Sequence, residues 1–144
     1  MGLKIVADDY GMLPEINHAV QELIRNNVVS KVSVMANEYI EYMQNDTDKG
    51  IEFGLHANLT ANLFSGGSGQ QNISPLRLIY LIYSRQLTID QINDMIKYQL
   101  DVLIKRGFKV AYIDTHHHVH VIPMVLKALI GCAETAGIKS IRAT

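Results

Sequence analysis

The sequence predicts an α/β fold built on a parallel sheet, and three observations support that prediction. Short apolar stretches rich in Val and Ile alternate with segments whose apolar residues recur at helical spacing. Most of the expected strands are apolar throughout, as parallel strands covered on both faces are. Several end directly in polar residues, and in parallel α/β folds functional sites collect at the carboxyl ends of the strands. We expect a single domain over residues 1–144.

The first half of the chain is expected to contribute three strands and two helices. The strands are expected at residues 3–7, 31–36 and 51–55. Asp8 and Asp9 follow the first strand, and Pro14 then opens a helix that carries its apolar residues on one face and stops near Asn26. A short helix is expected at residues 38–45.

The second half is expected to contribute three helices and two strands. Residues 61–73 are rich in Ser, Gly and Gln and predict an irregular connection, which is either a loop over a site or a solvated connector. Thr88 and Gln91 have the spacing of a capping box at the start of a long helix. The helices are expected at 76–84, 88–106 and 123–136, and the strands at 109–114 and 138–143.

The composition excludes several classes of protein. A hydrophobic content of 48% is enough for a core, and a net charge of −1 argues against a nucleic-acid partner. The single cysteine, Cys132, excludes an intrachain disulfide and is typical of a reducing compartment. The sequence shows no signal peptide and no apolar stretch long enough to span a bilayer. We therefore expect a cytoplasmic protein with no membrane partner.

Histidines are concentrated in one short segment near residue 118. The chain has 6 histidines, and four of them are His116, His117, His118 and His120. Imidazole suits both divalent metals and proton transfer near neutral pH. The neighbouring residues are Val, Ile and Tyr, so the segment is expected to continue the fourth strand and is not an appended tag.

Polar residues from three expected strands point to one metal site. Asp8 and Asp9 follow the first strand, His56 the third, and the histidines the fourth, and a carboxylate with two imidazoles leaves metal positions open for water and substrate. In extended backbone the adjacent aspartates point to opposite sides, so that one binds metal while the other orients or deprotonates water. If the fourth strand continues, one of its faces carries Asp114, His116, His118 and His120.

Each of these residues also has an ordinary interpretation. A pair of aspartates is often a solvated turn, His56 taken alone is a hydrogen-bonded structural histidine, and His18 receives no role. The same donors would also suit an iron oxygenase with two histidines and one carboxylate. The parallel α/β pattern and the second aspartate favour hydrolysis.

Three blocks of the sequence resemble the signatures of a known family. Residues 5–11 (IVADDYG), 54–60 (GLHANLT) and 113–120 (IDTHHHVH) resemble those of the YdjC-like carbohydrate deacetylases, which are related to chitooligosaccharide deacetylase. Asn17 and residues 138–142 also look similar. The resemblance implies metal-dependent removal of N-acetyl groups from amino sugars or chitooligosaccharides. It also implies a small-molecule N-acetylated sugar as the substrate.

The resemblance assigns roles residue by residue. Asp9, His56 and His116 match the family's metal ligands, with Mg²⁺ or Zn²⁺ as the expected ion. Asp8 matches the catalytic base beside the ligand. His120 is the candidate acid that protonates the leaving amine, whereas the roles of His117 and His118 stay open.

The resemblance also implies a (β/α) barrel, which in its TIM form has eight strands. The sequence predicts about five strands, so we expect a partial or distorted barrel. Such a sheet would expose an edge and apolar surface, and we expect a second copy to cover them in a homodimer. Two alternatives to such a homodimer are that the chain is part of a longer protein, or that it is a catalytically impaired remnant that still binds metal or sugar.

Overall fold

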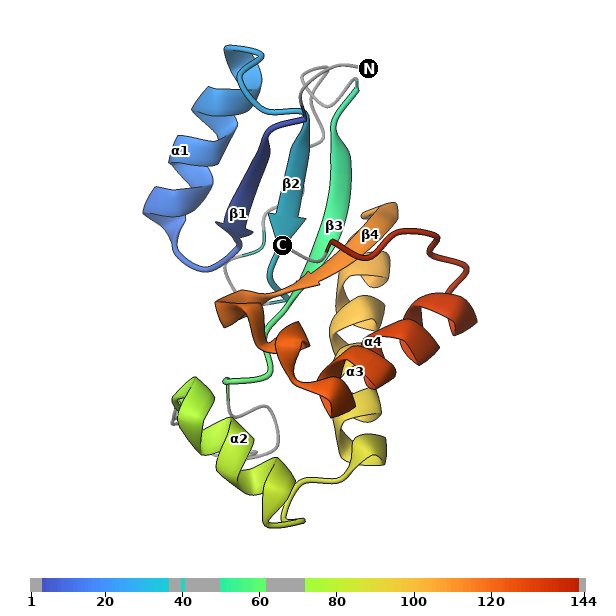
Figure 1. Cartoon of the computed structure of the whole chain (residues 1–144). Coiled ribbons are helices and arrows are strands. Elements are labelled where there is room, and N and C mark those ends of the chain that lie inside the picture. The colour runs from blue at the N-terminus through green and yellow to red at the C-terminus, as the bar shows by residue number, and fades with distance from the viewer. Residues whose placement is uncertain (1–3, 37–39, 41–49, 62–71, 143–144) are drawn as a thin grey trace.

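A parallel sheet forms the centre of the fold. The structure, a computed structural model, describes residues 4–36, 40, 50–61 and 72–142. Four strands form one sheet in the order β1-β2-β3-β4, and each neighbouring pair is parallel. They are β1 (Val6–Tyr10), β2 (Lys31–Val34), β3 (Glu52–Ala57) and β4 (Val110–Thr115). The predicted parallel α/β fold is confirmed. Closure into a TIM-like barrel is not, because the described strands form an open sheet (Figure 1).

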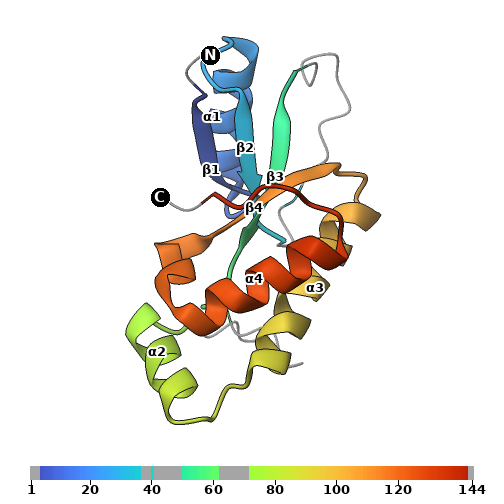
Figure 2. The same cartoon turned by 45° about the vertical axis from the view of Figure 1, so that its right-hand side comes forward.

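Helices flank this sheet. The described helices are α1 (Pro14–Arg25), α2 (Pro75–Tyr83), α3 (Ile89–Lys105), the 3-10 helix η2 (His116–Val121) and α4 (Pro123–Thr135). The predicted capping box begins α3: Thr88 Oγ1 accepts from Gln91 N at 3.3 Å, and Gln91 Oε1 accepts from Thr88 N at 2.9 Å. Helix α1 lies beside β1, whereas α3 and α4 pack together against β3 and β4 (Figures 1 and 2).

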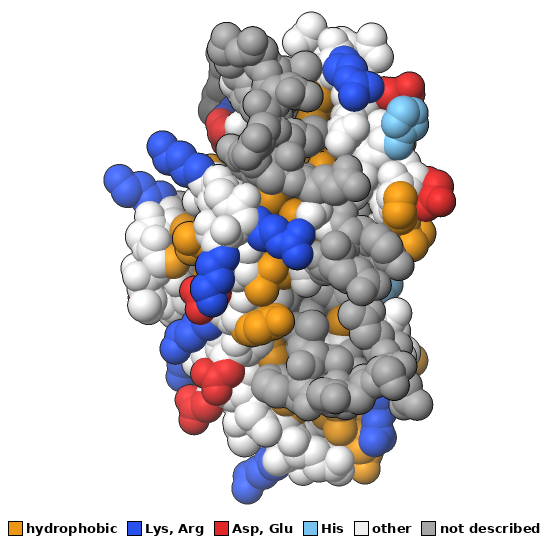
Figure 3. All heavy atoms as spheres, turned by 180° about the vertical axis from the view of Figure 1, so that it is seen from behind, with side chains coloured by type: hydrophobic (Ala, Val, Ile, Leu, Met, Phe, Trp, Pro, Cys, Tyr) orange, Lys and Arg blue, Asp and Glu red, His pale blue; other side chains and the backbone are white. Residues whose placement is uncertain are grey.

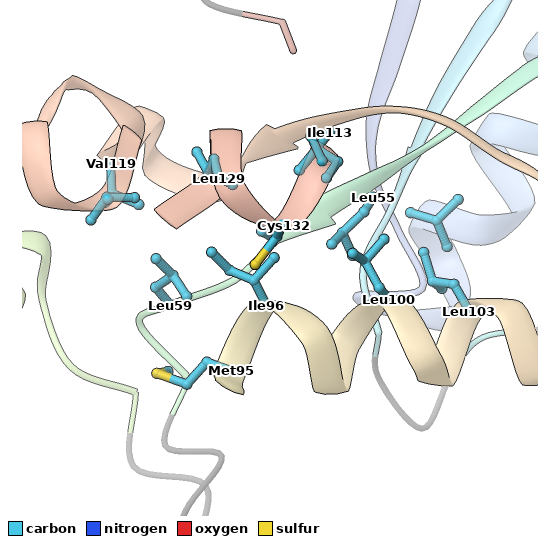
Figure 4. Packing of buried hydrophobic residues seen from close by; sticks show 14 of the residues in the cluster. Leu55, Leu59, Met95, Ile96, Leu100, Leu103, Ile113, Val119, Leu129 and Cys132 are labelled. Atoms are coloured by element: carbon cyan, nitrogen blue, oxygen red, sulfur yellow. The ribbon is translucent and has the colours of Figure 1, made fainter. Parts of the chain in front are cut away.

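The face of the sheet that meets the helices is apolar. Leu55 of β3 and Ile113 of β4 lie in one cluster with Ile96, Leu100 and Leu129 from α3 and α4 (Figure 4). None of these five residues is more than 4% exposed. Burying one such side chain contributes about 1.5–3 kcal/mol, so this face provides much of the stability of the fold.

The opposite face of the same strands is polar. Ser33, His56 and Asp114 alternate along their strands with the apolar residues, because successive side chains of a strand point to opposite faces. Gly54 lies in this face against the ring of Tyr112, which would overlap any Cβ at that position. The expectation of strands that are apolar on both faces is therefore wrong. The polar side chains are buried because they bond to one another.

Three predicted elements differ from the structure or lie mostly outside it. Residues 138–142, the described part of the fifth strand predicted at 138–143, form one parallel bridge from Ile141 to Ile113. Backbone hydrogen bonds run from Ile113 N to Ser140 O (3.1 Å) and from Arg142 N to Ile113 O (2.9 Å). Lys139 and Ser140 are exposed, so little burial supports longer pairing. The predicted helix at 38–45 and the irregular connection at 61–73 fall mostly outside the described residues.

The surface carries charges of both signs. On the face seen in Figure 3, Lys and Arg side chains lie among Asp and Glu side chains. In the described ranges, no helix combines the length and the apolar character that crossing a membrane requires.

Candidate metal centre

A bulge in β1 brings both aspartates toward one histidine. The strand extends beyond its predicted end, so Asp8 and Asp9 lie inside it, and it carries one extra residue against β2 between Ala7 and Tyr10. Asp9 has a φ of 64°, a left-handed value that Asp tolerates better than most residues. The fully extended backbone that the prediction assumed is interrupted at Asp9, but the two carboxylates still meet different partners: Asp9 Oδ1 lies beside His116, and Asp8 Oδ1 lies beside Arg142. Each aspartate offers a carboxylate oxygen within 4.8 Å of a ring nitrogen of His56.

The two imidazoles of the candidate centre come from the ends of β3 and β4. His56 lies inside β3, and His116 follows the last residue of β4 and begins η2. The predicted continuation of the fourth strand through the histidines is wrong. His117 and His118 have φ values of 56° and 53°, so the backbone turns sharply there. The four histidines therefore do not share one strand face, and only His116 joins Asp9 and His56.

Asp9 Oδ1 lies between the two rings. It is 3.2 Å from His56 Nε2 and 3.0 Å from His116 Nδ1, and the three donor atoms lie within 4.8 Å of one another. Neither contact has hydrogen-bond geometry, so this buried oxygen has no hydrogen-bond partner among the described residues. The imidazoles of His116 and His56 hold the pKa of Asp9 well below its usual range. One ionised oxygen and two ring nitrogens converging in this way suit a divalent cation.

Asp114 supports His56 from behind. Its Oδ1 lies 2.5 Å from His56 Nδ1, and its side chain is 2% exposed. Because a carboxylate only accepts, His56 Nδ1 donates and leaves Nε2 facing Asp9. Burial favours the neutral ring, but the hydrogen bond to Asp114 and the nearby carboxylate of Asp9 outweigh it and raise the pKa of His56 to about 9. A carboxylate behind a ligand histidine orients the ring and increases its basicity toward a metal.

Hydrogen bonds extend this network across the polar face. Ser33 Oγ donates to Asp114 Oδ2 at 2.7 Å and lies 2.9 Å from Tyr112 Oη. Since a serine hydroxyl has one proton, Tyr112 donates to Ser33. Burial raises the pKa of Tyr112, which keeps that proton in place. Ser33 and Tyr112 were not among the predicted site residues, because no local pattern places them beside Asp114.

Arg142 joins the carboxylates of Asp8 and Asp114. Its Nη2 donates to Asp8 Oδ1 at 2.7 Å and lies 2.8 Å from Asp114 Oδ2. Arg142 was not among the predicted site residues. Two signals were available: its place near the carboxyl end of the expected last strand, and the similarity of residues 138–142 to the family.

His120 lies in η2 and is not a member of the group formed by Asp9, His56 and His116. Its Nδ1 is 2.8 Å from Thr115 Oγ1, which also accepts from His120 N at 3.1 Å and so closes the turn. The ring is 5% exposed, and Nε2 has no hydrogen-bond partner among the described residues. His18, which received no role, is exposed and lies 3.5 Å from Glu22.

The turn after the aspartates is held by Asn17. Its Oδ1 accepts from Gly11 N at 2.6 Å, and Asn17 is 4% exposed on α1. Gly11 has a φ of 93°, and a Cβ there would lie 2.7 Å from Met35 O. A glycine is therefore required at this turn.

Comparison with known proteins agrees with the family resemblance seen in the sequence. The family model described as YdjC-like protein matches residues 2–144. A carbohydrate deacetylase of Thermoanaerobacter pseudethanolicus is 27% identical over 91% of this chain and 56% of its own length. A chitooligosaccharide deacetylase of an Enterobacter species is 28% identical over 94% of this chain and 57% of its own length.

A solved structure shares the fold. It is described as a cellobiose-phosphate cleavage protein from Enterococcus faecalis, with a TM-score of 0.75 and 20% identity over 98% of this chain and 58% of that chain. The chain also spans only about half the length of the curated relatives it matches, 56% and 57% of the two above.

Proposed function

The chain belongs to the YdjC-like protein family, and we propose that it works as a metal-dependent hydrolase that removes N-acetyl groups from amino sugars or chitooligosaccharides. The observation that carries this proposal is the convergence of Asp9 Oδ1, His56 Nε2 and His116 Nδ1. The deacetylases among its relatives support the reaction class.

Asp9, His56 and His116 would hold the cation, and Mg²⁺ and Zn²⁺ are the proposed ions. The unpaired buried oxygen of Asp9 and the two ring nitrogens fit such a group. When bound, the cation would supply Lewis-acid activation of water and of the acetamide carbonyl. Asp114 would keep His56 in the tautomer that binding requires.

Asp8 and His120 are the proposed proton carriers. Asp8 lies in the bulge beside Asp9, and Arg142 orients its carboxylate through a hydrogen bond of 2.7 Å to Oδ1. Asp8 would accept a proton from the attacking water. His120 would give a proton to the departing nitrogen. Its buried, unpartnered Nε2 supports that role. The products are acetate and a free amine.

Acetate release from N-acetylglucosamine oligomers, with Mg²⁺, Zn²⁺ or Co²⁺ added, tests the proposal. We expect turnover that falls by about 10²–10⁴-fold in Asp8→Asn, the usual contribution of a general base. Asp101→Asn, on the exposed side of α3, is the matched control. No acetate with any of the three metals, while a full-length relative works in parallel, would refute catalysis by this chain. Bound metal without turnover would instead favour a non-catalytic binding protein.

The predicted homodimer stays a prediction. Leu76, Tyr80 and Tyr83 lie one helical turn apart on α2 and are 77%, 52% and 72% exposed, which supports apolar association there. Sedimentation equilibrium of the wild-type chain measures its mass in solution, and a monomer at all concentrations would contradict the predicted homodimer.

A further inference from the structure

The donors around His56 form two clusters, and the second contains Arg142. Asp9, His56 and His116 make the first. Asp8, His56 and Asp114 make the second, with one donor atom from each residue within 4.8 Å of the others. His56 Nδ1 donates to Asp114 in this second cluster, so the donors that would suit a cation there are the carboxylate oxygens of Asp8 and Asp114.

A guanidinium already occupies the second cluster. Arg142 Nη2 lies 2.7 Å from Asp8 Oδ1 and 2.8 Å from Asp114 Oδ2. A zinc or calcium ion would lie about 2.0–2.6 Å from the same oxygens. The nitrogen and an ion would therefore compete for the same space, and their like charges would repel each other.

The position of Arg142 is built into the fold. Its backbone N donates to Ile113 O at 2.9 Å, in the bridge beside β4. Its side chain is 22% exposed, and the Asp114 side chain is 2% exposed. A buried carboxylate requires a paired positive charge, and Arg142 provides it to Asp114 while also holding Asp8. Among the described residues, no Lys or Arg forms a salt bridge with Asp9 of the first cluster, and the groups close to Asp9 Oδ1 are the two imidazoles.

We propose that Arg142 keeps this centre a one-cation site, because its guanidinium stands where a second cation would bind between Asp8 and Asp114. Arg142 is thus a positioning residue that orients Asp8 and determines the number of ions. The inference deepens the proposed function, on which the role of Asp8 rests, but the number of ions is independent of turnover.

Equilibrium dialysis of the full chain against Mn²⁺ and Zn²⁺, with bound metal counted per chain, tests this inference. We expect Arg142→Met, which removes the charge and keeps much of the volume, to bind one ion more than the wild type. Arg142→Lys keeps the charge and should bind the wild-type number. Arg25→Met, at the exposed end of α1, is the control for loss of a cationic side chain. In Arg142→Met the Mn²⁺ electron paramagnetic resonance spectrum should also show a coupled pair.

Equal counts in folded Arg142→Met and wild type, or two ions in the wild type, would overturn the inference. If the wild type binds no ion and Arg142→Met binds one, the exclusion of a cation from between Asp8 and Asp114 by Arg142 is supported, and the proposed metal centre at Asp9, His56 and His116 fails. If neither binds an ion, both fail. Should Arg142→Met not fold, two ions on wild type or Arg142→Lys would overturn the inference, and one on each would support it.

Discussion

On one face of the sheet, Leu55 and Ile113 are fully buried against helices, whereas the other face of the same strands carries Ser33, His56 and Asp114 in a hydrogen-bonded network. Neighbouring residues along β3 and β4 therefore serve different purposes, because the pleat sends them to opposite sides. The apolar face provides stability that depends on volume and burial. The polar face depends on the directions of a few bonds, so its changes should affect the candidate site more than the fold.

The largest effect should come from the candidate ligand on the polar face. Asp9→Asn replaces the ionised oxygen between the two imidazoles, so we expect metal binding to be lost. Turnover should fall at least about a thousandfold, which corresponds to several kcal/mol in activation free energy. Titration calorimetry with Zn²⁺ measures the binding. Far-ultraviolet circular dichroism should be unchanged. Wild-type affinity in this variant would contradict the assignment of Asp9.

A change on the apolar face should lower the stability of the fold and leave metal affinity unchanged. Ile96 on α3 is fully buried, and Ile96→Ala should lower the free energy of unfolding by about 2–5 kcal/mol. Ile104, on the same helix, is 55% exposed, so Ile104→Ala should cost less than about 0.5 kcal/mol. Urea unfolding measures both. Metal affinity of the folded Ile96→Ala chain should equal that of wild type, and a large loss of affinity would break the separation of the two faces.

A smaller effect is expected behind the ligands. Asp114→Asn keeps the shape of the side chain but removes the charge that orients His56 and pairs with Arg142. We expect metal affinity to fall about 10–100-fold, as is usual for a carboxylate behind a ligand histidine. Competition with a chromophoric chelator measures it. An affinity within twofold of wild type would show that the His56 ring is held without Asp114.

The smallest effect is expected at the other end of the polar face. Lys31 and Lys4 lie 2.7 and 2.6 Å from Glu52 and lower the pKa of its carboxyl to about 2. A lowered folded-state pKa stabilises the fold above the unfolded value near 4.5, and this contribution is lost as the pH falls toward 2. Because Glu52 is 43% exposed, Glu52→Gln should cost less than about 1 kcal/mol at pH 7.

Urea unfolding at pH 7 and pH 3 checks this prediction, with and without added salt. The difference between Glu52→Gln and wild type should shrink at the lower pH and at high ionic strength. A cost that is the same at both pH values would mean that packing and not charge is responsible.

Much of the fold could be predicted from local patterns. Apolar runs and helical spacing located all four described strands and all four described α-helices, and the capping box at Thr88 and Gln91 marked the start of α3. The rule that polar residues collect at the carboxyl ends of parallel strands predicted that Asp8, Asp9, His56 and the histidine segment would meet, and Asp9, His56 and His116 do lie together. These features depend on residues close in sequence or on a general property of the sheet, so the sequence is sufficient for them. The choice of Asp9, His56 and His116 as metal ligands came from the family resemblance and stays a prediction.

The tertiary structure decided how the polar residues meet. The bulge that turns both Asp8 and Asp9 toward His56 depends on pairing with β2, and the turn of η2 depends on a bond that Thr115 makes to the backbone of His120. Arg142 reaches Asp8 across 134 positions of the chain. Local periodicity carries no information about contacts at such separation, because they form only when the strands pack side by side.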